Sequence, residues 1–289
     1  MIFQKYPLGV LLNTARLADS GALGRAQTTL IPLLEASPTN AIVIPNIVIL
    51  EFFRGQSAEK RIKSLSFLAP YADRIFILRP GVKIANDPDL LTPTPTNLLD
   101  EKITADFRYI FKILEHRYAN EVVTAIAVFY AKHTDSYFDS LTKSAATIKA
   151  DILAETAQFP KDGIVALRAK RAVNDETLKY MVDSVISLSA EMLSDHHSEI
   201  LEPRQIIETF HFRFVLCAYT MELEWRVRGG LNTAKDKTVR NDVTDSLIAA
   251  QSMYFDGLIT NDEKLKSIHA KALWALNFIF RPLAERARC

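Results

Sequence analysis

Short apolar runs alternate with longer segments of helical periodicity in the first part of this chain. Three runs have the length and apolar character of buried strands: Leu8–Leu12, Ala41–Ile44, which is rich in β-branched residues, and Arg74–Leu78. Between them, apolar side chains recur at helical spacing, which predicts helices over residues 17–34, 46–53 and 58–68, the second with Asn46 as a plausible N-cap. Strands alternating with helices predict an α/β fold with a parallel sheet covered on both faces.

A Pro/Thr-rich spacer at residues 91–97 ends this alternation. Residues 98–227 then have an almost wholly helical pattern, broken near Pro160 and Pro203, and Arg228–Thr233 forms a second spacer. The α/β pattern returns with a helix, the short strand Leu258–Ile259 and a candidate fifth strand at residues 277–280. We therefore expect an α/β domain made of residues 1–85 together with 235–289, with an all-helical insertion at residues 86–234.

The composition excludes several classes of protein. The 35 basic and 34 acidic residues nearly cancel, so attraction to nucleic acid would have to come from local patches. The chain has only Cys217 and Cys289, which argues against a disulfide framework or a zinc cluster and suits a reducing compartment. The first residues lack a signal-peptide pattern, and no apolar run reaches the roughly 20 residues of a membrane helix. We expect a cytoplasmic protein with no membrane partner.

Polar residues follow two of the predicted strands. Asn13 comes directly after the first strand and Asp262 after the fourth, while Asp245 lies on the helix before the fourth strand and Glu51 on the helix after the second. Because ligands of parallel sheets bind beyond the carboxyl ends of the strands, these side chains are expected to meet in one place. Carboxylate oxygens are the ligands that Mg²⁺ and Mn²⁺ prefer, so the pattern predicts a site for one of these ions.

Three segments resemble the PIN-domain nucleases, a family of metal-dependent ribonucleases common among bacterial toxins. Gly9–Thr14 resembles the first strand of the family, which ends in Asp-Thr or Asp-Ser. Ile44–Gly55 resembles the helix that carries the second acid, here Glu51. Asp245–Ala250 followed by Leu258–Asp262 resembles the segment of the third and fourth acids.

The resemblance implies a PIN-like, Rossmann-like three-layer domain and a Mg²⁺- or Mn²⁺-dependent endoribonuclease, with a toxin or defence role. It also implies that position 13, Glu51, Asp245 and Asp262 are the catalytic, metal-binding positions. RNA would be the substrate, and a second copy of the chain or a regulatory protein would be the expected protein partner.

This sequence departs from the family at position 13, where Asn13 replaces the expected aspartate. An amide can offer an oxygen to a metal but no charge, so metal affinity should fall. Either the chain is naturally unable to cleave and is a PIN-like RNA-binding or scaffolding protein, or an aspartate was replaced to inactivate a toxic enzyme. We favour the second interpretation. A third alternative is a mainly helical interaction protein in which the acids are coincidental.

Further residues are candidates for supporting roles around these acids. Thr14, Asp242 and Thr260 could orient the metal ligands, although each has an ordinary role as a cap or strand end. Likewise, Asp245 could simply start a helix and Asp262 could cap one. A basic cluster precedes the acids and could hold a phosphate backbone, or could be a solvated linker. Its members are Arg226, Arg228, Lys235, Lys237 and Arg240.

Overall fold

The protein is described here by a computed structural model. It describes residues 15–55, 57–114, 121–126, 128, 135–143, 147, 150, 154, 158–169, 174–194, 201–228 and 234–280. The chain divides into two compact units, which are treated separately. Unit 1 consists of residues 1–138 with 251–266, and unit 2 of residues 139–250 with 267–289.

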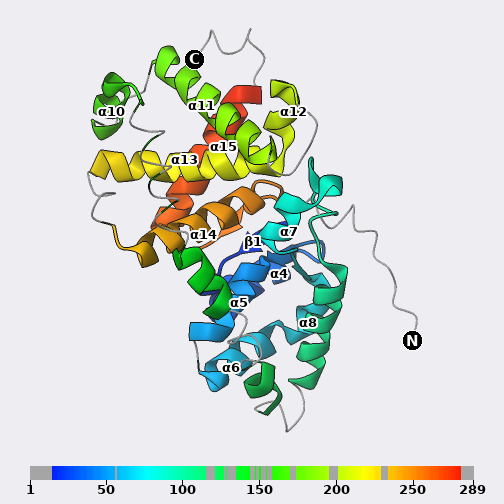
Figure 1. The fold of residues 1–289 in the computed structure, drawn as a ribbon. Coiled ribbons are helices and arrows are strands. Elements are labelled where there is room, and N and C mark those ends of the chain that lie inside the picture. The colour runs from blue at the N-terminus through cyan, green and yellow to red at the C-terminus, as the bar shows by residue number, and fades with distance from the viewer. Residues whose placement is uncertain are drawn as a thin grey trace. The chain divides into compact units, whose positions relative to one another are not determined.

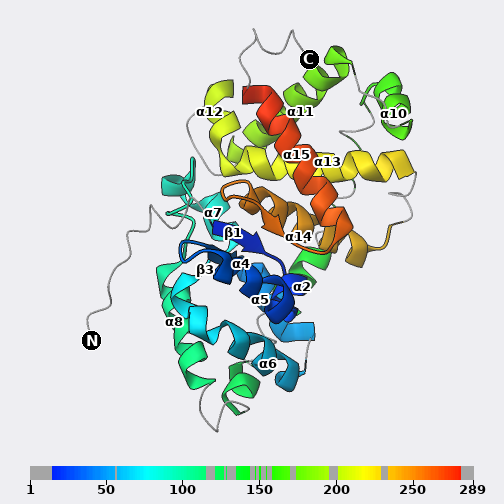
Figure 2. The same cartoon turned by 180° about the vertical axis from the view of Figure 1, so that it is seen from behind.

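Unit 1 contains a parallel sheet of four strands (Figures 1 and 2). The strands are β1 (Ala15–Ala18), β2 (Ala41–Ile44), β3 (Ile75–Ile77) and β4 (Leu258–Ile259), in the spatial order β3-β2-β1-β4. All four residues of β2 are fully buried, so both faces of the sheet are covered at its centre. The predicted α/β fold with a parallel sheet is confirmed.

Short helices connect the first three strands. The chain passes from β1 to β2 through α2 (Ser20–Gly24), α3 (Ala26–Thr29) and α4 (Ile31–Ala36). It then passes from β2 to β3 through α5 (Asn46–Gly55), α6 (Ala58–Leu68) and the 3-10 helix η2 (Ala69–Arg74). The helix predicted from residue 17 begins later, because Leu17 and Ala18 pair with β2 and β4 inside the sheet. Asn46 is the first residue of α5, not its cap, and the predicted strand Leu8–Leu12 lies outside the described residues.

The strand order reverses at β1. The chain leaves β1 and builds β2 and then β3 on one side, whereas β4, from the far end of the sequence, pairs with the other side of β1. The amide N–H of Leu17 donates to the carbonyl of Gly257, and that of Asp19 donates to the carbonyl of Ile259. A reversal of this kind is the place where open α/β sheets bind their ligands, at the carboxyl ends of the two strands. In this chain those ends are followed by Asp19 and Thr260.

Helix α8 (Glu101–Ile113) covers the edge strand β3 (Figures 1 and 2). The Thr104 hydroxyl accepts a hydrogen bond from the amide N–H of Ile77 at 2.9 Å, and the Arg108 guanidinium donates to the carbonyls of Ala72, Asp73 and Ile75. The bonds to Ile75 and Ile77 occupy backbone groups that an edge strand would otherwise leave unpaired. Helix α8 therefore belongs to unit 1, although the sequence analysis assigned it to the helical insertion. Between β3 and α8 lie α7 (Gly81–Asn86), η3 (Pro88–Leu90) and the Pro/Thr spacer.

The described part of unit 2 is helical. It contains α10 (Lys161–Arg168), α11 (Asp175–Ser194), α12 (Pro203–Glu208) and α13 (Phe210–Arg228), with α10 and α11 packed on α13. The boundary between the units falls within α14 (Asp236–Ser252) and within α15 (Glu263–Phe280). The fifth strand predicted at residues 277–280 is wrong, since these residues form the last turn of α15. Among the helices whose residues are described, none is long and apolar enough to cross a membrane.

Candidate functional site

The residue that follows β1 is Asp19, which the sequence analysis did not select. Its side chain is 7% exposed, and its Oδ1 accepts a hydrogen bond from the amide N–H of Ala22 at 2.6 Å as the N-cap of α2. A buried carboxylate needs hydrogen bonds to offset its lost hydration. The cap therefore explains how Asp19 is tolerated at the end of a buried strand, and it fixes the direction of the carboxylate.

Thr260 connects Asp19 to the acid that follows β4. Its hydroxyl donates to Asp19 Oδ2 and accepts from the amide N–H of Asp262 at 2.9 Å. Thr260 is itself only 6% exposed. A continuous chain of hydrogen bonds thus runs from Asp19 through Thr260 to the backbone of Asp262, joining the carboxyl ends of two neighbouring strands.

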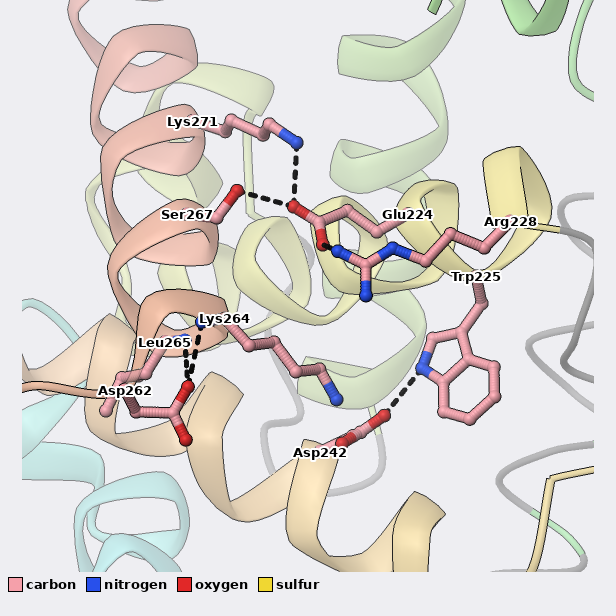
Figure 3. A network of polar contacts seen from close by, with 9 residues as sticks. All are labelled: Glu224, Trp225, Arg228, Asp242, Asp262, Lys264, Leu265, Ser267 and Lys271. Carbon is pink, nitrogen blue, oxygen red and sulfur yellow. Dashed lines mark hydrogen bonds and ion pairs between the residues drawn. The ribbon is translucent and has the colours of Figure 1, made fainter. Parts of the chain in front are cut away.

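Asp262 caps the N-terminus of α15. Its Oδ1 accepts hydrogen bonds from the amide N–H groups of Lys264 at 2.8 Å and Leu265 at 3.1 Å (Figure 3). The residue is exposed, unlike Asp19. The ordinary role considered for Asp262, a helix cap, is therefore present. A carboxylate has further lone pairs, so capping through one oxygen leaves capacity for another ligand.

Glu51 lies on α5 in unit 1. It is half-buried, whereas its neighbours Phe52 and Phe53 are almost completely buried. The pKa of Tyr137 is raised mainly by burial and secondly by the negative charge of Glu51. The Tyr137 hydroxyl is therefore within electrostatic reach of the Glu51 carboxylate. The role of Glu51 as a metal ligand stays a prediction.

The two acids selected on α14 have different surroundings within unit 2. Asp242 is 2% exposed, and its Oδ2 accepts a hydrogen bond from the indole Nε1 of Trp225 at 2.5 Å (Figure 3). This contact gives Asp242 a structural role in joining α13 to α14. Asp245 is half-buried on the same helix, and its role as a metal ligand stays a prediction.

The predicted basic cluster is only partly available to a ligand. Arg226 forms an ion pair with Glu222 at 3.9 Å, and Arg228 forms one with Glu224 at 3.1 Å. Arg240 is 9% exposed and donates to the side chain of Asn241, so its burial does not fit the predicted contact with a phosphate backbone. Lys235 and Lys237, at the start of α14, are exposed.

Glu224 is the centre of a second polar network, inside unit 2 (Figure 3). Its Oε1 accepts hydrogen bonds from the Ser267 hydroxyl at 2.6 Å and from the Lys271 ammonium at 2.7 Å, while Oε2 pairs with Arg228. Burial alone would raise the pKa of Glu224, but the hydrogen bonds from Lys271 and Ser267 and the nearby positive charges lower it below its ordinary value. This network ties α13 to α15.

Within the residues that the structure describes, no group of three or more His, Cys, Asp or Glu side chains is arranged to hold a metal ion. Asn13 and Thr14 lie outside that part of the chain. Comparisons of this chain with models of protein families, with curated proteins and with solved structures find no match.

Proposed function

We propose that this chain is a PIN-like, metal-dependent endoribonuclease in which Asp19, not position 13, is the first acid. The observation that supports the proposal is the hydrogen-bonded series Asp19–Thr260–Asp262 at the reversal of strand order. Asp19 and Ser20 also form the Asp-Ser pair with which the first strand of the PIN-domain nucleases ends. The structural position and the sequence pattern both support this choice of residue.

Asp19 and Asp262 are suitable ligands for a hard divalent cation. Mg²⁺ is usually bound by one or two carboxylates and keeps several of its waters, so it does not require a cluster of three protein ligands. Both oxygens of Asp19 already accept hydrogen bonds, from Ala22 and Thr260, but a carboxylate has about four lone-pair sites. We propose Mg²⁺ or Mn²⁺ as the cofactor, held by Asp19 and Asp262.

The residues of the chain have distinct tasks in this proposal. The hydrogen bonds from the Ala22 amide and the Thr260 hydroxyl hold the Asp19 side chain in one direction. The hydrogen bond from the amide N–H of Asp262 to the Thr260 hydroxyl fixes the position of Asp262 relative to Asp19. When bound, the ion would activate a water and stabilise the leaving oxygen of the phosphodiester.

Asn13 has no catalytic task in this proposal. If Asp19 supplies the first charge, neither a natural loss of activity nor a replaced aspartate is needed to explain the asparagine. RNA as the substrate, and a toxin or defence role, rest on the resemblance to the PIN-domain nucleases.

The proposal is tested by incubating the chain with a labelled RNA pool in the presence of Mg²⁺ or Mn²⁺, and again after chelation. We expect cleavage that chelation abolishes, and a loss of about 100-fold or more in the variants Asp19→Asn and Asp262→Asn. Both substitutions keep an oxygen that can cap a helix. Asn at position 19 also replaces the oxygen that accepts from Thr260, so the folding of both variants is checked by circular dichroism.

Asp256→Asn is the matched control. Asp256 is exposed and lies before β4, where its amide N–H donates to the carbonyl of Ala15, at the opposite end of these strands. Its removal should leave cleavage unchanged. Cleavage that persists in both Asp19→Asn and Asp262→Asn would contradict the proposal, and RNA binding without cleavage by the unaltered chain would support the scaffolding alternative.

A further inference from the structure

Arg25 lies at a break between two short helices of unit 1. Helix α2 ends at Gly24 and α3 begins at Ala26, and the carbonyl of Arg25 accepts hydrogen bonds from the amides of Thr28 and Thr29. The amide N–H of Arg25 donates to the carbonyl of Ala22. The backbone of Arg25 is therefore held by hydrogen bonds through both its N–H and its carbonyl. These bonds fix the position from which the Arg25 side chain extends.

Asn261 holds the guanidinium of Arg25. With the side-chain amide of Asn261 oriented to satisfy its neighbours, its oxygen accepts from Arg25 Nη2 at 2.6 Å and from Nε at 3.2 Å. Asn261 stands between Thr260 and Asp262, so the residue that orients Arg25 belongs to the same loop as the proposed site. Because the partner is a neutral amide, this contact orients the guanidinium without cancelling its charge.

Gly21 shows how close Arg25 comes to Asp19. A Cβ at Gly21 would lie 3.3 Å from Arg25 Nη2, 3.4 Å from Asp19 Oδ1 and 3.7 Å from Asp19 Oδ2. The guanidinium and the carboxylate therefore lie against the same side of α2, over a residue that has no side chain.

We propose that Arg25 contacts the phosphodiester group of the RNA beside Asp19. A guanidinium has five N–H donors, of which Asn261 uses two, and the side chain of Arg25 is exposed. The remaining donors suit the oxygens of a phosphate, which a guanidinium can bind through two parallel hydrogen bonds. Negative charge grows on these oxygens as a phosphodiester is cleaved, so a cation next to the acids would stabilise the transition state. This inference rests on the proposed function, since it assigns a substrate contact to the same site.

The variants Arg25→Gln and Arg25→Lys test the contact, with Arg16→Gln as the matched control. Arg16 is an exposed arginine on β1 of the same unit, so its removal makes the same change in net charge away from the site. Two readouts are needed: cleavage kinetics with metal, and binding of a single-stranded RNA oligonucleotide in a chelator across a range of NaCl concentrations.

We expect Arg25→Gln to lower kcat/KM by about 100-fold and to reduce the slope of log affinity against log salt by about 0.7, the value for one lost phosphate contact on a single strand. Arg25→Lys keeps the charge and should restore the salt slope but only part of kcat, because an ammonium cannot reproduce the planar contact with Asn261. Asn261→Ala should likewise lower kcat while keeping the slope, as expected for a positioning residue.

The two readouts separate this inference from the proposed function. An unaltered chain that cleaves RNA, with Arg25→Gln matching Arg16→Gln in both readouts, would overturn the contact and leave the nuclease proposal intact. An unaltered chain that binds RNA without cleaving it, with a reduced slope in Arg25→Gln, would overturn the nuclease proposal and support the contact. A chain that neither binds nor cleaves RNA would overturn both.

Discussion

The hydroxyl of Thr260 donates a hydrogen bond to the carboxylate of Asp19, across 241 positions of sequence. Both residues are buried, and each directly follows a strand at the reversal of the sheet order. The bond therefore determines the relative position of two loops that come from opposite ends of the chain. The proposed active site depends on that position.

Replacing Thr260 by valine should destabilise unit 1 by about 1–3 kcal/mol, because Asp19 loses a donor and the amide of Asp262 loses an acceptor. Urea denaturation followed by circular dichroism would measure the change. Thr260→Ser keeps the hydroxyl and should lose less than half as much. Equal losses in the two variants would indicate that packing of the methyl group, not the hydrogen bonds, is responsible.

Substitutions at position 13 should leave cleavage unchanged, because the proposal gives the first charge to Asp19. We expect Asn13→Asp and Asn13→Ala to cleave RNA at the rate of the unaltered chain within about twofold, whereas Asp19→Asn loses about 100-fold or more. Initial rates with Mn²⁺ would show the difference. A large gain of activity in Asn13→Asp would indicate that position 13, and not Asp19, is the first acid.

Arg108→Met should destabilise the protein by about 2–3 kcal/mol. The substitution removes hydrogen bonds to three carbonyls next to β3 and the stacking of the guanidinium on the Phe76 ring, at 5.0 Å. Lys102→Met is the control, since Lys102 is an exposed cation on the same helix. A comparable loss in both variants, measured by denaturant midpoint, would show that α8 does not depend on these contacts.

The stability of the protein should fall in acid partly through Glu224. Its pKa is lower in the folded chain than the ordinary value of 4.5, so its contribution is present above that value and is lost as the pH falls below it, toward the folded pKa. Glu224→Gln should therefore cost about 1.5–3 kcal/mol at pH 7 and less at pH 3. Glu263→Gln, which alters an 84% exposed carboxylate on α15, should change little at either pH. A loss in Glu224→Gln that is independent of pH would contradict this account.

The sequence was sufficient to predict the strands that have strong local signals. Ala41–Ile44, Ile75–Ile77 and Leu258–Ile259 are apolar and largely β-branched, and the structure confirms them. The strand at Ala15–Ala18 was missed because two alanines, an arginine and a leucine favour a helix when taken alone. Pairing with a strand on each side overrides that preference, and no local pattern records it.

The missed strand also hid the residue that the proposal makes the first acid. Once β1 is placed at residues 15–18, Asp19 stands where an acid is expected, and the pattern Asp19-Ser20 could have indicated it from the sequence. At the other end of the chain, residues 277–280 attracted a strand prediction because they include aromatic and β-branched side chains. Their helix is instead set by the buried positions on one face of α15, which lie three, seven, ten and eleven residues after Leu265: Ile268, Ala272, Ala275 and Leu276.

The separation of Asp19 from Thr260 along the chain also affects synthesis of the protein. A ribosome that has translated the chain as far as residue 250 has made three of the four strands that the structure describes, but it has not yet made the loop that completes the proposed catalytic centre. Under the proposed function, nascent and truncated forms would lack nuclease activity until the last segment pairs with β1. If the protein cuts RNA, this order of assembly would protect the mRNA from which it is being translated.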